Sequence, residues 1–247
     1  SRAARAQPKR RQREPSPPES HARAAASVRS AASQPGKLAS LAREKCGSRS
    51  LQSELARMSD AQLARACAEL APSLHELATH PYGNYVVSKL ASLSHARQHM
   101  LRALRGHVGE LVTHAQGSRV VQAAITALPI ADAEALVDEL RGHVAETAAD
   151  THGSWGVCVA FERTGAPFIL ADVSLRLYEL STDQHGVRVV QRVLKAAGTR
   201  GLDLGPAVDV AMRGGEAAGG GAIDLEALAA HSFGNYAVQA RHPARRL

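Results

Sequence analysis

The chain has 247 residues, a formal net charge of +7 and only 3% aromatic residues. Its length allows one or two ordinary domains with a buried core. So few aromatics argue against an all-β sandwich or barrel, whose strands favour aromatic and β-branched residues. No run approaches the roughly eighteen consecutive apolar residues of a membrane span. The three cysteines, Cys46, Cys67 and Cys158, form no CxxC pair, so we expect neither a disulfide framework nor a zinc knuckle, and a reducing compartment.

The charge excess lies in an N-terminal tail, residues 1–37. This tail holds nine Lys or Arg and two Asp or Glu, whereas basic and acidic residues balance in 38–247. It also holds five of the eleven prolines and few large apolar residues, so it cannot fold alone. A solvated leader and an extended arm that orders on RNA are both open. For the arm, the residues expected to contact RNA phosphates are Arg2, Arg5, Lys9, Arg10, Arg11 and Arg13.

The composition of the tail also bears on the compartment. Its Arg-, Ser- and Ala-rich, acid-poor sequence overlaps with that of organelle transit peptides, and Ser1 fits a mature N-terminus left by processing. The sequence therefore favours a mitochondrion or another organelle, with the nucleolus and the cytoplasm as alternatives.

Residues 38–247 contain an internal repeat anchored on glycine. Six windows share it: KCGSRSLQ, PYGNYVVS, AQGSRVVQ, THGSWGVC, QHGVRVVQ and SFGNYAVQ. Their glycines are Gly47, Gly83, Gly117, Gly153, Gly186 and Gly234, at spacings of 36, 34, 36, 33 and 48 residues. The long interval contains a glycine-rich stretch, 198–221, which we interpret as a loop insertion between the last two units.

Apolar residues recur upstream of Gly83, Gly117, Gly153 and Gly186, with Thr147 as the one polar exception. They stand thirteen, nine and six residues before each of these glycines, as Leu70, Leu74 and Leu77 do before Gly83, and the string LRGHV occurs twice in this register. Steps of four and three predict one face of a helix. We therefore expect each unit to be a helix, a tight turn and a second helix, and the units to stack because neither helix can bury its apolar face alone. The predicted fold is an all-α solenoid of about six units.

The strings GNYVV, GSRVVQ, GVRVVQ and GNYAVQ resemble the Pumilio (PUF) repeat. The resemblance covers roughly residues 38–241 and implies a right-handed solenoid in which the second helix of each unit lines a concave RNA-binding face. It further implies that one unit reads one base through the first, second and fifth residues after the glycine. Residues at the second position would stack on bases, and all six are arginine or aromatic: Arg49, Tyr85, Arg119, Trp155, Arg188 and Tyr236.

The first and fifth positions would contact base edges. The pairs are Ser48/Gln52, Asn84/Ser88, Ser118/Gln122, Ser154/Cys158, Val187/Gln191 and Asn235/Gln239. By the resemblance, Ser with Gln indicates adenine and Asn with Gln indicates uracil, and the RNA runs antiparallel to the repeats. The implied target is 5′-U-n-n-A-n-A-3′. Val187 cannot hydrogen-bond to a base and Cys158 does so only weakly, so we expect no base-edge contact from either.

We expect no enzyme activity, cofactor or metal site. Histidines precede five of the glycines, but they belong to separate units without a convergent thiolate or carboxylate, so we interpret them as turn or helix-start residues. No GxSxG, HExxH or P-loop pattern is present.

Three functions remain after these exclusions. The leading one is an RNA-binding structural or assembly component of a ribonucleoprotein such as a mitochondrial ribosome, with rRNA and neighbouring proteins as partners. Half of the base-reading pairs depart from the PUF pattern, and the repeat number is below the eight of regulatory PUF domains, which favours this role. The alternatives are a regulator that binds single-stranded messenger RNA and a protein-interaction scaffold like armadillo or HEAT arrays.

Overall fold

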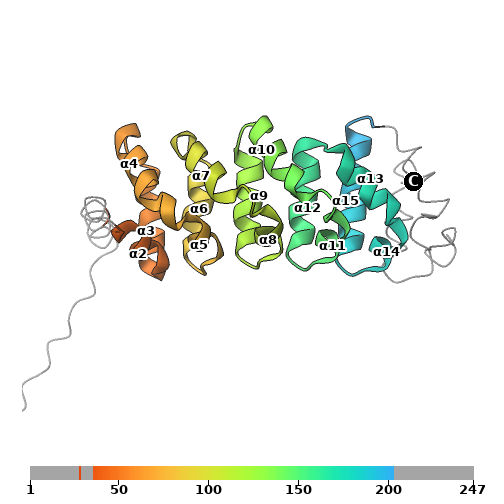
Figure 1. Ribbon diagram of the computed structural model, residues 1–247, viewed down its shortest axis with the longest axis horizontal. Helices are drawn as coiled ribbons and strands as arrows, with labels where there is room; N and C mark the ends of the chain where they lie inside the picture. The colour runs from red at the N-terminus through yellow and green to blue at the C-terminus, as the bar shows by residue number, and fades with distance from the viewer. Residues whose placement is uncertain (1–27, 29–35, 203–247) are drawn as a thin grey trace, which may run out of the picture.

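The computed structural model describes residue 28 and residues 36–202. All the regular elements in this part are helical, and they form a row of stacked units (Figure 1). The predicted all-α repeat solenoid is confirmed. No helix among the described residues has both the length and the apolar character needed to span a membrane. The sixth glycine window and, apart from Val28, the tail before Gly36 lie outside the described residues.

Each complete unit contains three helical segments. The first segments are α4 (Asp60–Leu70), α7 (Arg97–Leu104), α10 (Ile130–Val137) and α13 (Pro167–Leu175). The second are short: α5 (Leu74–Thr79), α8 (Val108–Thr113), α11 (Val144–Ala149) and α14 (Leu177–Thr182). The third, which we call the anchored helices, are α6 (Gly83–Ala91), α9 (Gly117–Ala127), α12 (Gly153–Thr164) and α15 (Gly186–Thr199). The first unit has α2 (Lys37–Arg43) and an anchored helix α3 (Lys45–Leu55), and 3-10 turns η1 (Ala71–Ser73), η2 (Ser94–Ala96) and η3 (Asp138–Leu140) join segments.

The prediction of one helix before each glycine was wrong in the units of α8 and α11, where a turn separates two helical segments. Leu104 ends α7 and Val108 begins α8, with Gly106 between them at a φ of +78°. Gly142 has the same φ in the next unit, so the string LRGHV is a turn. This left-handed backbone conformation is accessible mainly to glycine. The apolar residues are still buried, because the turn brings both segments against the same core.

The anchor glycines allow a close approach between two segments. A Cβ atom on Gly117 would lie 2.7 Å from the carbonyl oxygen of Leu111 on α8. The same close approach recurs at the equivalent glycines. For example, a Cβ atom on Gly186 would lie 2.6 Å from the carbonyl oxygen of Leu180. The repeat is anchored on glycine because no side chain fits where the anchored helix starts against the short helix before it.

A side-chain acceptor three residues before the glycine starts four of these helices. His80 Nδ1 accepts hydrogen bonds from the backbone N–H groups of Tyr82 and Gly83, each at 3.2 Å. The Asp183 carboxylate accepts the equivalent pair before α15 at 2.8 and 2.6 Å. His114 and Asp150 do the same before α9 and α12. His80 and His114 are therefore helix-start residues, as predicted, and they satisfy donors that a helix leaves unpaired.

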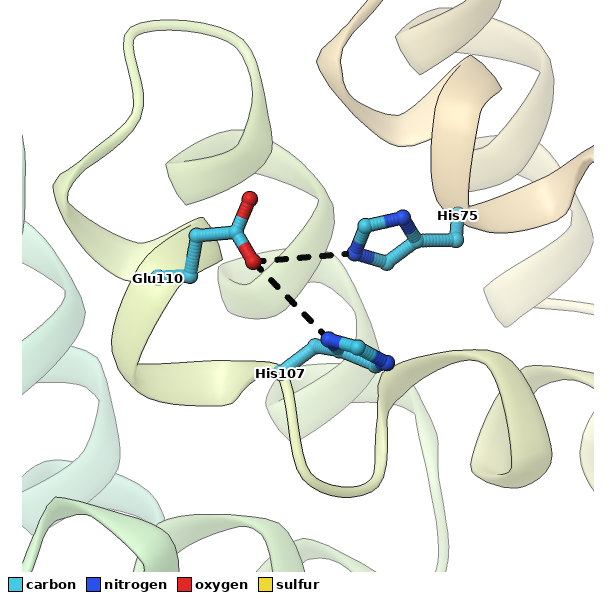
Figure 2. Close-up of side chains that lie close together, drawn as sticks. All are labelled: His75, His107 and Glu110. Atoms are coloured by element: carbon cyan, nitrogen blue, oxygen red, sulfur yellow. Dashed lines mark ion pairs between the residues drawn. The ribbon is translucent and has the colours of Figure 1, made fainter.

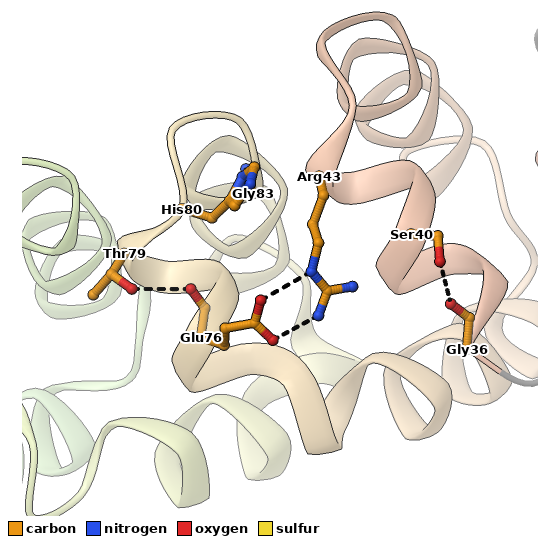
Figure 3. A network of polar contacts seen from close by, with 7 residues as sticks. All are labelled: Gly36, Ser40, Arg43, Glu76, Thr79, His80 and Gly83. Carbon is orange, nitrogen blue, oxygen red and sulfur yellow. Dashed lines mark hydrogen bonds and ion pairs between the residues drawn. The ribbon is translucent and has the colours of Figure 1, made fainter.

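Ion pairs connect successive units. Arg43 on α2 donates two hydrogen bonds, of 2.9 and 2.6 Å, to the carboxylate of Glu76 on α5 (Figure 3). Figure 3 also shows Thr79 donating to the carbonyl of Glu76, and Ser40 donating to the carbonyl of Gly36, within single segments. The hydrogen bond from Arg43 holds the pKa of Glu76 below its ordinary value. Such two-point contacts fix the orientation of one unit on the next.

The first two residues of the predicted insertion at 198–221 belong to a helix. Helix α15 continues through Thr199, so Gly198 is helical. Residues 203–221 of the insertion lie outside the described part of the chain.

Candidate nucleic-acid interface

The anchored helices place the predicted stacking residues in one row, which we call the ladder. Consecutive anchored helices pack side by side, so the second residue after each glycine repeats at the same place on each unit. Tyr85 and Trp155 are 45% and 44% exposed, so a large part of each ring is open to solvent. Within the described chain the ladder comprises Arg49, Tyr85, Arg119, Trp155 and Arg188. Tyr236 lies outside the described residues.

Neighbouring ladder residues touch one another. Arg119 Nη1 donates a 3.2 Å hydrogen bond to the Tyr85 hydroxyl. The guanidinium of Arg188 lies 4.8 Å from the centre of the Trp155 ring, within the range of a cation–π contact. Arg192 lies 5.0 Å from the same ring and also pairs with Glu162. The sequence analysis missed Arg192; its position one helical turn after Arg188 was the available signal.

A groove of about 440 Å³ runs beside the central part of the ladder. Tyr85, Arg119 and Trp155 line it from α6, α9 and α12. Asn84, Ser118 and Gln122, all predicted base-edge residues, lie in the same lining. The structure thus brings stacking and base-edge candidates from three successive units into one groove.

The two units with a Ser/Gln pair share one hydrogen-bond network. The hydroxyl of Ser118, which is buried, donates to the carbonyl of His152 in the next unit at 2.9 Å. Because that uses its only proton, the hydroxyl accepts from Gln122 Nε2, also at 2.9 Å. Ser48 repeats both contacts, to the carbonyl of Tyr82 and from Gln52. Gln52 Nε2 also donates to the backbone carbonyl of Ser48 at 3.2 Å. Each glutamine amide is therefore oriented by its own unit and the next one. The Oε1 of both glutamines and the second N–H of Gln122 are not used in this network.

The other units differ at these positions. Asn84 donates to the carbonyls of His80 and Pro81, and its buried Oδ1 has no hydrogen-bond partner among the described residues. The buried hydroxyl of Ser154 also lacks one there. Cys158 is fully buried, and burial raises the pKa of its thiol to about 11.

The remaining predicted site residues are partly or fully buried, or lie outside the described residues. Ser88 and Gln191 are half-buried, and Val187 is buried. Asn235, Gln239 and the six basic residues of the tail lie outside the described part of the chain. The structure therefore assembles the interface best in the units of α6, α9 and α12.

Comparison with known families fits this arrangement. The family model described as the Pumilio-family RNA binding repeat matches residues 37–71, 73–87, 107–141 and 176–199. The chain belongs to the Pumilio family. This is an RNA-binding family, in agreement with the expectation of a non-enzymatic protein. Residues 142–175, which include the Ser154/Cys158 pair, are outside the matched segments.

Solved Pumilio structures share the fold. The Puf3 RNA-binding domain bound to a Cox17 RNA 3′ UTR recognition sequence is 24% identical with a TM-score of 0.70, over 85% of this chain and 59% of that domain. PUF-8 in complex with PBE-RNA is 24% identical with a TM-score of 0.72, over 85% and 60%. A double mutant of Puf4 on a Cox17 sequence is 15% identical with a TM-score of 0.76, over 89% and 72%. This Pumilio chain therefore spans about three fifths of the Puf3 and PUF-8 chains.

Proposed function

We propose that this Pumilio chain binds single-stranded RNA along the anchored helices, with bases stacked on the ladder. The observation that carries the proposal is the groove between Tyr85, Arg119 and Trp155, where planar side chains from three units flank oriented polar groups. Exposed planar groups at a regular repeat suit successive bases, since every base has a π-face. Each stacked base contributes about 1–3 kcal/mol.

In this proposal Gln52 and Gln122 each read an adenine. An amide that offers one acceptor and one donor matches the N6 amino group and a ring nitrogen of adenine. Ser48 and Ser118 act as positioning residues, because their hydroxyls are buried and already bonded to the next unit and to the glutamine. The described units then read 5′-A-n-A-3′ within the longer 5′-U-n-n-A-n-A-3′.

The messenger RNA alternative now has more support than the ribosomal role. Puf3 and Puf4 are solved on 3′ UTR recognition sequences, and a 3′ UTR belongs to a messenger RNA. The ribosomal role rests on the departing base-reading pairs, the low repeat number and the basic tail, and the predicted phosphate contacts of the tail lie outside the described residues. We therefore propose a single-stranded messenger RNA as the target class. A protein-interaction scaffold would not need an exposed planar residue in every unit.

Binding of short fluorescent RNAs tests the proposal. The full chain should bind an RNA containing 5′-U-n-n-A-n-A-3′ more tightly than one in which both adenines are cytosines. Gln122→Ala should reduce this preference at one adenine by about 1–3 kcal/mol, equivalent to roughly 5- to 150-fold. Trp155→Ala should weaken binding to both RNAs, because stacking is tolerant of sequence.

A matched control separates the ladder from other exposed aromatics. Tyr178 on α14 is as exposed as Tyr85 but does not line the groove. Tyr178→Ala should leave RNA affinity unchanged, whereas Tyr85→Ala should reduce it. Equal affinity of the wild-type chain for the target and a scrambled RNA would refute base reading, and equal effects of the two tyrosine variants would refute the ladder. Crosslinking and sequencing of bound RNA in cells then distinguishes messenger from ribosomal targets.

A further inference from the structure

Three metal-ligating side chains meet at the junction of two units, away from the groove. His75 lies on α5, whereas His107 precedes α8 and Glu110 lies on it (Figure 2). His75 Nε2 lies 3.9 Å from Glu110 Oε2, and His107 Nδ1 lies 3.8 Å from the same oxygen. The three ligand atoms lie within 4.8 Å of one another. None of the three residues lines the groove.

The unsatisfied nitrogen of His75 points to a missing ligand. Its Nε2 is shielded from solvent and has no hydrogen-bond partner in the described structure, although the residue itself is partly exposed. A shielded polar atom without a partner is uncommon, and an ion is one of its ordinary explanations. The side chains of His107 and Glu110 are 46% and 67% exposed, so an ion can enter from solvent.

The donor set suits a divalent transition metal. Two imidazole nitrogens and one carboxylate oxygen are ordinary zinc ligands, and tetrahedral zinc places neighbouring ligand atoms about 3.4 Å apart. Rotation of the exposed Glu110 side chain can shorten its distances of 3.9 and 3.8 Å to the two imidazole nitrogens. The ligand atoms span up to 4.8 Å, so the exposed His107 ring must also rotate to bring the two imidazole nitrogens closer together. We propose that His75, His107 and Glu110 form a site for Zn²⁺ that joins two successive units. Three protein ligands leave a fourth position for water.

The repeat supplies an internal comparison. His143 and Glu146 occupy in α11 the same register as His107 and Glu110, and they lie 3.4 Å apart. The residue of α8 that corresponds to His75 is Gly109, which offers no ligand. The same pair of ligands therefore occurs twice, but the third ligand is present at only one junction. The sequence expectation of no metal site considered only the histidines beside the anchor glycines.

A Zn²⁺ competition titration against a chromophoric chelator tests the site. The full chain carrying Cys46→Ser is used as the reference, because Cys46 is an exposed thiol that would compete for zinc. In this background, His75→Ala and Glu110→Gln should each lower the zinc affinity by about tenfold or more. Loss of a residue that only supports a metal ligand already lowers metal affinity by about tenfold, and loss of a ligand itself should cost at least as much. His143→Ala should leave the affinity unchanged.

A gain-of-site variant makes the test two-sided. A Cβ on Gly109 meets no atom within 4 Å, so a larger side chain has room there. Gly109→His should add a second Zn²⁺ equivalent, formed with His143 and Glu146. At the same concentration, zinc should also raise the Tm of the reference chain by more than that of the Glu110→Gln variant. Equal zinc affinity in the reference, His75→Ala and Glu110→Gln chains would overturn the proposal. It would also be overturned if His143→Ala lost as much zinc affinity as His75→Ala, or if the Gly109→His chain bound no second equivalent of zinc.

Discussion

Gly117 and Gly109 stand eight residues apart and differ in what a side chain would meet. A Cβ on Gly117 would lie 2.7 Å from a backbone oxygen, whereas one on Gly109 meets nothing within 4 Å. Gly117→Ala should destabilise the fold by about 1–3 kcal/mol, because the two segments must move apart. Gly109→Ala should stabilise it by about 0.5–1 kcal/mol, because alanine restricts the unfolded chain and favours the helix.

Chemical unfolding of both alanine variants measures the difference. The wild-type chain is the common reference, and the two substitutions add the same methyl group. A shift of both midpoints in the same direction would contradict the close-approach explanation of the anchor glycines.

The three cysteines differ in their surroundings and should differ in reactivity. Cys46 is exposed, while Cys67 and Cys158 are buried, and burial raises the pKa of each buried thiol to about 11. The thiolate is the reactive form. Cys67 and Cys158 should therefore react slowly at neutral pH, both because their raised pKa leaves little thiolate and because burial keeps the reagent away. A thiol reagent should label one cysteine quickly in the native chain and all three in denaturant. Rapid labelling of the native Cys46→Ser variant would show that the buried thiols are accessible.

At the scale of the element, the starts of the anchored helices depend on one acceptor each. Asp183 accepts two backbone hydrogen bonds before α15. Asp183→Ala should therefore cost about 1 kcal/mol in the free energy of unfolding, the usual effect of losing a helix cap. Asp183→Asn keeps an oxygen at this place and should recover most of the loss. Urea unfolding compares the three chains, and an equal loss in the Asn variant would assign the effect to charge instead.

The contact between α2 and α5 should make stability depend on pH. Arg43 holds the pKa of Glu76 below its ordinary value through a side-chain hydrogen bond. The pair therefore stabilises the fold above the ordinary pKa of Glu, and this contribution disappears as the pH falls through the lowered value. Arg43→Ala should thus lower stability at neutral pH and make no difference in acid. The effect is small, since both side chains are partly exposed.

An NMR titration of Glu76 measures the same linkage directly. Arg43→Ala should return the pKa of its carboxyl towards the ordinary value for Glu. An unchanged pKa in that variant would show that Arg43 is not its cause.

The sequence predicted the anchored helices better than the segments before them. The glycine register marked the helix starts correctly, at Gly83, Gly117, Gly153 and Gly186. At each of these positions the backbone of the preceding short helix lies so close that only glycine fits, so the sequence must repeat there. The break between α7 and α8 was missed, since Leu104 and Val108 face one core on either side of a turn and keep a helical spacing. Gly106, within the repeated LRGHV, was the signal for that turn.

In the candidate site, too, the sequence predicted some features and missed others. The ladder followed from residue type and register alone, because each anchored helix presents the same position to the same side. The network of Ser118, Gln122 and the carbonyl of His152 depends on the contact between two units, which no single window contains. The cluster of His75, His107 and Glu110 likewise joins residues of two units and appeared only in three dimensions.

At the scale of the whole molecule, the net positive charge and the groove lie in different parts of the chain. Residues 1–37 carry the entire formal charge of +7, while the groove lies in the balanced part of the chain. Stacking on the ladder depends weakly on salt, whereas phosphate contacts release counterions and depend on it strongly. The two parts of the chain should therefore contribute to RNA affinity in ways that a salt titration separates.

Removing the charge of the tail tests this division. We replace Arg2, Arg5, Lys9, Arg10, Arg11 and Arg13 by glutamine, which keeps the length of the tail. Each lost phosphate contact reduces the slope of log affinity against log salt by about 0.7 for single strands, so loss of all six reduces it by about 4. Trp155→Ala should instead lower the affinity at every salt concentration with little change in slope. Fluorescence anisotropy at several salt concentrations measures both, and an unchanged slope in the glutamine variant would place the phosphate contacts on the repeats.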